Sequence, residues 1–153
     1  MIRDMLYAAA GATPSSTLWV ATINGPTSTG TSNDYGQGIA VDSSGNFYVA
    51  GQSSNGTDSD IVVVKYNTSG TLQWQRKLIK TAADIGWGIA VDSSGNCYVT
   101  GQSHNGTNSD IVVIKYNTSG TLQWQRQLAG TSSDYGYGIT VDSSGNCYVT
   151  GSS

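Results

Sequence analysis

Charged side chains are scarce in this sequence, and their scarcity excludes one large class of partner. Only 11% of the 153 residues are charged, the net charge is −3, and the seven Lys and Arg residues are scattered along the chain. Nucleic-acid binding requires a basic face that neutralises phosphate groups. We therefore expect no nucleic-acid partner.

Long apolar runs and a clear export signal are also missing. No apolar stretch approaches the roughly 18 residues that span a bilayer, so no membrane insertion is expected. The first ten residues contain a short apolar stretch like that of a signal peptide, but Asp4 interrupts the expected basic region. We interpret this segment as something other than a signal peptide, which leaves the localisation unknown.

Histidine is nearly absent, which removes the usual means of metal binding and acid–base catalysis. His104 is the single histidine, and no Cys, Asp or Glu stands at a recognisable ligand or triad spacing from it. We therefore expect no metal, no cofactor and no His-based nucleophilic catalysis.

What the sequence does contain is a repeat with a period of 50 residues. The segment 34–46 returns from Asp84 and again from Asp134, and residues 34–83 match 84–133 at 38 of 50 positions. A fixed period of this length indicates a solenoid, a propeller or an array, because a single unit cannot bury its own apolar faces.

Each repeat contains four strand-like segments, which we name strands A, B, C and D. In the first repeat they lie near residues 38–42, 46–52, 60–66 and 71–79. Strands A to C are apolar on both sides, as in a sheet buried front and back, whereas strand D alternates apolar with polar residues, as at an outer edge. Four antiparallel strands graded from buried to exposed predict the blade of a β-propeller.

The repeat also resembles a known family. The run DYGQGIAVDSSGNFYVAG, followed by SDIVVVKYN, is similar to the bacterial β-propeller repeat family called SBBP, for seven-bladed β-propeller. The resemblance implies a propeller in an extracellular or cell-surface bacterial protein, and it brings no shared catalytic residues. This chain is too short for seven blades.

The predicted domain organisation is a single array with one blade divided between the two ends of the chain. Residues 1–33 supply strands C and D of the divided blade, 34–83 and 84–133 form whole blades, and 134–153 supply strands A and B. Three blades per chain are too few to close a ring, since closed propellers usually have four to eight. We expect homo-oligomerisation to close it. A homodimer with six blades is the favoured form, and a homotrimer with nine blades or a head-to-tail filament are the alternatives.

Differences between the repeats gather at the D–A connections and the B–C loops, which emerge on one face of a propeller. The varying positions there are Tyr35/Ile85/Tyr135, Gln37/Trp87/Tyr137, Ser54/His104, Asp58/Asn108 and Lys80/Gly130. An aromatic and polar rim suits a sugar or a peptide, and the candidate ligand-binding residues are Tyr35, Gln37, Trp87, His104, Tyr135 and Tyr137. The competing interpretation is that these loops simply tolerate substitution.

Two further recurring features are interpreted as structural. Asp42, Asp92 and Asp142 each open an Asp-Ser-Ser-Gly-Asn loop, but one carboxylate per loop is too few for calcium, and Asp and Asn commonly stabilise such turns. Cys97 and Cys147 fill a slot that Phe47 fills in the first repeat, so we predict two buried free thiols rather than a disulfide.

The function predicted from the sequence is a non-enzymatic β-propeller repeat scaffold that self-assembles, with a carbohydrate or peptide site as a candidate addition. The alternatives left open are a propeller hydrolase or lyase, a structural subunit of an extracellular filament, and an engineered propeller fragment.

Overall fold

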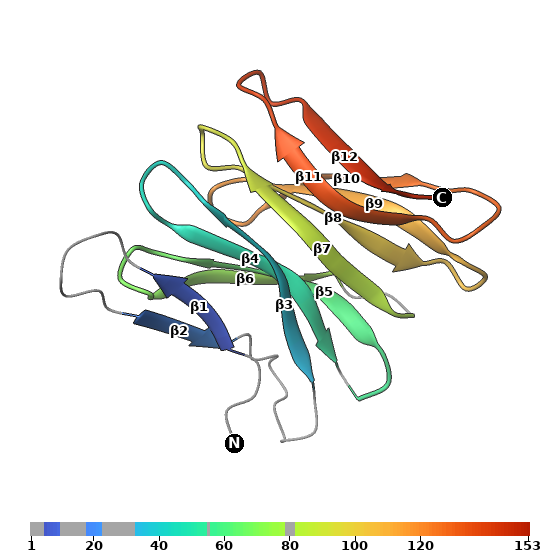
Figure 1. The fold of residues 1–153 in the computed structure, drawn as a ribbon, viewed down its shortest axis with the longest axis horizontal. Helices are drawn as coiled ribbons and strands as arrows, with labels where there is room; N and C mark the ends of the chain where they lie inside the picture. Colours follow the sequence, from blue (N-terminus) through green and yellow to red (C-terminus); the bar gives the residue numbers. More distant parts are fainter. Residues whose placement is uncertain (1–4, 10–17, 23–32, 55, 79–81) are drawn as a thin grey trace.

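The chain folds into an all-β structure. The computed structural model describes residues 5–9, 18–22, 33–54, 56–78 and 82–153 (Figure 1). No helix in this part of the chain is long and apolar enough to cross a membrane. The strands found there are β1 (Met5–Ala9), β2 (Leu18–Thr22), β3 (Asp34–Val41), β4 (Phe47–Ser54), β5 (Ser59–Tyr66), β6 (Leu72–Leu78), β7 (Asp84–Val91), β8 (Cys97–His104), β9 (Ser109–Tyr116), β10 (Leu122–Leu128), β11 (Tyr135–Val141) and β12 (Cys147–Ser152).

These strands form two four-stranded and two two-stranded antiparallel sheets. The four-stranded sheets have the orders β3-β4-β5-β6 and β7-β8-β9-β10, so each strand pairs with its neighbour in sequence, as strands A to D of a blade should. We call them blade 1 and blade 2. The remaining sheets are the β1–β2 hairpin and the β11–β12 hairpin, which lie at opposite ends of the array in Figure 1.

β1 and β2 pair antiparallel within the segment interpreted from the sequence as strands C and D of the divided blade. Ala8 lies opposite Trp19, as Lys65 lies opposite Trp74 in blade 1. Parts of the predicted segment 1–33, namely 1–4, 10–17 and 23–32, lie outside the described residues, as does Lys80.

Strand A is longer than the sequence suggested. It begins at Asp34 rather than near Gly38, because residues 34–36 already pair with β4 before the register shifts between Gly36 and Gly38. Gln37 is left unpaired as a β-bulge, and the pairing then continues to Val41. The sequence segment interpreted as a D–A connection is therefore partly strand.

The core lies between the sheets and on both faces of blade 1. One cluster joins the two blades, with Tyr48, Ile61 and Val63 from blade 1 packed in a common core with Val99 and Ile114 from blade 2. A second cluster takes the alternate positions of blade 1: Phe47, Val49, Val62, Val64 and Tyr66. Burial on both faces explains why strands B and C are continuously apolar.

Candidate functional site

The varying residues of strand A are positioned by a β-bulge that recurs in every copy. The register shifts between Gly36 and Gly38, between Gly86 and Gly88, and between Gly136 and Gly138. Gln37, Trp87 and Tyr137 are therefore the three bulged residues. Bulges re-aim a side chain and occur often next to functional sites, so the repeat presents one exchangeable side chain at the same place in each sheet.

The bulges also mark where inner strands of neighbouring sheets meet. A Cβ atom on Gly38 would lie 2.9 Å from the backbone carbonyl oxygen of Trp87, and one on Gly88 would lie 2.9 Å from that of Tyr137. Only glycine permits this approach. The bulged residues therefore lie next to the junction between successive strands A.

Aromatic rings gather at two of these bulges. Trp87 and Tyr137 meet edge to face with centroids 6.3 Å apart, and Tyr135 stacks on Tyr137 with centroids 6.2 Å apart. Trp87 Nε1 donates a hydrogen bond to Gln102 Oε1 (3.3 Å), and Ser152 Oγ donates one to the Tyr137 hydroxyl (3.3 Å). We call Trp87, Tyr135 and Tyr137 the aromatic rim.

The other three predicted site residues are placed less favourably for a shared site. Tyr35 and Gln37 are exposed on β3, and no ring contact joins Tyr35 to another described aromatic residue. His104 is half-buried at the end of β8, and its Nδ1 accepts a hydrogen bond from the Gly106 amide (3.0 Å). Within the described residues, the structure thus brings together three of the six candidates, while His104 holds its own B–C loop.

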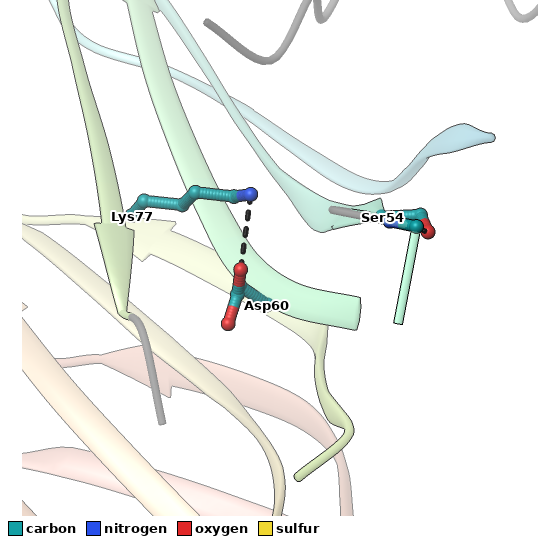
Figure 2. Close-up of polar contacts among 4 residues, drawn as sticks. Ser54, Asp60 and Lys77 are labelled. Atoms are coloured by element: carbon teal, nitrogen blue, oxygen red, sulfur yellow. Dashed lines mark hydrogen bonds and ion pairs between the residues drawn. The ribbon is translucent and has the colours of Figure 1, made fainter. Parts of the chain in front are cut away.

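Buried carboxylates lie at the same end of the sheets, in an arrangement that the sequence does not reveal. Asp60 is buried and forms an ion pair with Lys77, with Nζ and Oδ2 3.0 Å apart; Figure 2 shows the Lys77 side chain reaching to the start of β5. In blade 2, Gln127 replaces Lys77 and donates a hydrogen bond to Asp110 Oδ2 (2.6 Å). The carboxylate at this position therefore has a side-chain partner in both blades, an ammonium group in blade 1 and an amide in blade 2.

The pairing register arranges these acids in rows. Asp34 lies opposite Ser53, which lies opposite Asp60, and the row Asp84, Ser103, Asp110 repeats the arrangement in blade 2. Ser53 and Ser103 are fully buried. The only sequence signal for this row is the return of the same Asp and Ser positions 50 residues later, which does not reveal which strands lie side by side.

At the opposite end, the Asp-Ser-Ser-Gly-Asn turns use their carboxylates internally. Asp42 Oδ1 accepts hydrogen bonds from the amides of Ser44 and Asn46, and Oδ2 accepts them from Asn46 Nδ2 and the Tyr48 hydroxyl, all within 3.1 Å. Partial burial, the largest single influence, raises the pKa of Asp42, but these hydrogen bonds together lower it below the ordinary carboxyl value. The same bonds recur at Asp92 and Asp142. The carboxylate in each loop therefore stabilises the turn.

The two cysteines are free, as predicted, but they are not equally buried. Cys97 is fully buried, and burial raises the pKa of its thiol to about 12. Cys147 is only half-buried, because β12 pairs with β11 alone among the described strands. The expectation of two buried thiols is correct for Cys97 and wrong for Cys147.

Comparison with known proteins gives one family match. A family model described as SBBP, β-propeller repeat, matches residues 19–58, 73–108 and 123–153, which together make up more than half of the chain. A search of curated proteins found no match.

Proposed function

The chain belongs to the SBBP β-propeller repeat family, and from this premise we propose that it is a non-enzymatic scaffold whose copies complete one another's blades. The family and the antiparallel four-stranded sheets make it an all-β repeat protein of propeller type. Association between copies, and the number of blades in the closed ring, are our proposal.

The observation that carries this proposal is the exposure of the third copy of strand B. Tyr48 and Tyr98 are fully buried, whereas the equivalent Tyr148 is 57% exposed. Val49 and Val99 are likewise buried, and Val149 is 38% exposed. The same residues that form the core of the blades thus lie uncovered on β12.

Blade 1 presents a complementary surface on strand A. Ile39 and Val41 are 46% and 63% exposed on β3, whereas the equivalent Ile89 in blade 2 is 9% exposed because it packs in the core against blade 1, the sheet that precedes it. A β11–β12 hairpin from another copy would cover β3 while its β12 paired with β1. The two exposed surfaces differ, so the contact is head-to-tail and closes into a ring if the rotation permits.

The composition of the uncovered surfaces favours a permanent association. Fully burying an apolar side chain contributes about 1.5–3 kcal/mol, and both surfaces consist of positions that are core elsewhere in this chain. Such an interface resembles a domain core cut in half and should bury upwards of about 2,000 Å². An unpaired strand edge beside it would otherwise invite aggregation.

Native mass spectrometry tests the association directly. With a chain mass of 15.9 kDa, we expect about 32 kDa for a homodimer with six blades, which we favour, and about 48 kDa for a homotrimer with nine; a head-to-tail series would indicate a filament. Val149→Lys, which places a charge on the β12 edge, should prevent association. Gln123→Lys adds the same charge at an exposed position of β10 and should not. A folded monomer at all concentrations would contradict the proposal.

A second candidate function is binding of a carbohydrate or peptide at the aromatic rim. The contact of Trp87 with Tyr137, beside the amide of Gln102, combines ring faces with polar groups as sugar-binding surfaces do. A glycan array compared with the triple variant Gln37→Ala, Trp87→Ala, Tyr137→Ala tests it. Binding that the triple variant retains would remove this site from consideration.

The alternative of a propeller hydrolase or lyase has less support. An enzyme should present convergent titratable groups in a pocket, whereas Asp60 and Asp110 are engaged by Lys77 and Gln127. Turnover of a polysaccharide that Asp110→Asn abolishes without unfolding the chain would favour the enzyme.

A further inference from the structure

Three donors on the outer strands of blade 1 bind the C–D turn of blade 2. Trp74 Nε1 donates to the carbonyl oxygen of Thr118 (3.0 Å), and Lys65 Nζ donates to the same oxygen (3.3 Å). Arg76 donates from Nε to the carbonyl oxygen of Gly120 (2.6 Å) and from Nη2 to that of Ser119 (3.3 Å). We call Lys65, Trp74 and Arg76 the clasp of blade 1.

The turn is built so that its carbonyl groups remain available to this clasp. Asn117 Oδ1 accepts hydrogen bonds from the amides of Ser119 and Thr121, and its carbonyl oxygen accepts one from the Gly120 amide. The amides of Ser119, Gly120 and Thr121 are thus satisfied internally, and the three consecutive carbonyl oxygens of residues 118–120 are left as acceptors. Gly120 has a φ of +75° and lies under Trp74, where a Cβ would come within 2.7 Å of the indole.

Blade 2 contains the equivalent residues Lys115, Trp124 and Arg126, which we call the second clasp. Their side chains are arranged as in blade 1, but no described turn is bound to them. Arg126 lies over Trp124 at 5.7 Å, the distance that separates Arg76 from Trp74. Trp124 meets Tyr98 edge to face at 6.1 Å, as Trp74 meets Tyr48 at 6.0 Å, and Lys115 lies over the Tyr98 ring at 4.7 Å. Among the described residues, no carbonyl of a following C–D turn lies against Lys115, Trp124 or Arg126, and Trp124 and Arg126 are more exposed than their counterparts.

The position of this second clasp identifies its occupant. Blade 2 is followed in the array by β11–β12, which packs against it through β11 (Figure 1). In both complete blades, strand C pairs along the edge of strand B, from Phe47–Tyr66 to Ser54–Ser59 in blade 1. A hairpin that paired with β12 in this register would place its C–D turn against the second clasp.

We propose that Lys115, Trp124 and Arg126 bind backbone carbonyls of a second copy of this chain, whose β1–β2 hairpin pairs with the β12 edge. This inference rests on the proposed association and names the residues that recognise the partner. The clasp contacts main-chain oxygens, so it does not read the side chains of Thr118 and Ser119.

A synthetic peptide tests the clasp separately from association of the whole chain. The probe is a fluorescently labelled peptide of residues 109–128, which contains strands C and D with their turn, added to the full-length chain and followed by anisotropy. We expect it to bind and to convert oligomers into a one-to-one complex of chain and peptide. Trp124→Phe, which keeps an aromatic ring but removes the indole N–H donor, and Arg126→Ala should each weaken peptide binding about five- to tenfold.

Blade 1 supplies matched controls. Trp74→Phe and Arg76→Ala change the same residue types where the turn is already bound, so they should lower stability and leave peptide affinity unchanged. Changes within the peptide separate backbone recognition from side-chain recognition. Thr118→Ala and Ser119→Ala should be tolerated, and Gly120→Val should abolish binding because the side chain would collide with Trp124.

Each combination of outcomes decides between the two proposals. If the chain associates but the Trp124 and Arg126 variants bind peptide as the unmodified chain does, the clasp inference is wrong and the association proposal stands. If the peptide binds with the expected losses but the chain remains a monomer, the clasp binds a C–D turn, but the proposals that copies associate and that the clasp holds a second copy are both wrong. If no peptide binds at any concentration, the clasp is refuted.

Discussion

Three equivalent tyrosines offer a measurement of what a neighbouring sheet contributes to stability. The Tyr48 hydroxyl donates to Asp42 Oδ2 (3.1 Å) and to the carbonyl oxygen of Gly95 in the next blade (3.3 Å). Tyr98 repeats this with Asp92 (3.0 Å) and Gly145 (3.5 Å). Tyr148 retains the bond to Asp142 (3.0 Å) but is 57% exposed. Replacing each by Phe removes the same hydroxyl from three environments.

The expected costs follow from burial. A hydrogen bond to a charged group contributes about 1.5–3 kcal/mol when its partner is left without a substitute. Because the aspartates here are half-buried and water can reach them, we expect Tyr48→Phe and Tyr98→Phe to lower the free energy of unfolding by about 1–2 kcal/mol. Tyr148→Phe should cost less than about 0.5 kcal/mol, since water replaces the lost donor at an exposed site.

Urea unfolding followed by tryptophan fluorescence measures the series. With a slope of about 2 kcal/mol per molar urea, the two buried variants should shift the midpoint by about 0.5–1 M. A dilution series is essential, because association would bury Tyr148 and make its cost rise with protein concentration. Equal costs at Tyr48 and Tyr148 that do not change with concentration would refute the reasoning.

Two other perturbations follow from the titrating groups. The folded-state pKa values of Asp42, Asp92 and Asp142 lie below the ordinary value of 3.8, so their contribution to stability is present above that pH and is lost as the pH falls through the folded value. Melting temperature should therefore be nearly constant from pH 7 to about pH 5 and drop below about pH 4, less steeply in Asp92→Asn; a rise on acidification would contradict the assignment. For the thiols, a disulfide reagent at pH 8 should modify Cys147 first and Cys97 only on unfolding, because burial raises the pKa of Cys97 to about 12. Association should slow the reaction of Cys147, and equal rates for the two thiols would contradict their placement.

Much of the fold could be predicted from the sequence because the information is local. The period of 50, the Asp-Ser-Ser-Gly-Asn and Asn-Thr-Ser-Gly turns and the apolar runs predict antiparallel strands in the order A, B, C, D, and the structure confirms that order in β3–β6 and β7–β10. The start of strand A at Asp34 was not predicted, because the residues before Gly38 are of types that are also expected in a loop. The bulge at Gln37 changes the strand pairing, and this change has no signal in those residue types.

The candidate site was harder to predict, since it depends on contacts between sheets. Variation between repeats selected Trp87, Tyr135 and Tyr137, whose rings contact one another in the structure. It also selected His104, which accepts a hydrogen bond from the Gly106 amide in its own loop and, within the described part of the chain, makes no ring contact with the other three. The clasp could not be predicted for the opposite reason. Its residues are identical in the two repeats, so variation between repeats does not distinguish them: Lys65 and Lys115, Trp74 and Trp124, Arg76 and Arg126.

Identical residues at equivalent positions of the repeats therefore contribute differently to the free energy of unfolding, because different sheets cover them. Val49 and Val99 are fully buried and Val149 is 38% exposed, although all three follow a tyrosine in the same strand of the same repeat. Truncating either buried valine to alanine should cost about 2 kcal/mol through lost transfer energy and the cavity left behind. Val149→Ala should leave the unfolding free energy of the dilute chain nearly unchanged and weaken association instead, because the partner's hairpin is what would bury that side chain. If Val149→Ala destabilises the dilute chain as much as Val99→Ala does, then β12 is already covered, and the head-to-tail completion of the blade is wrong.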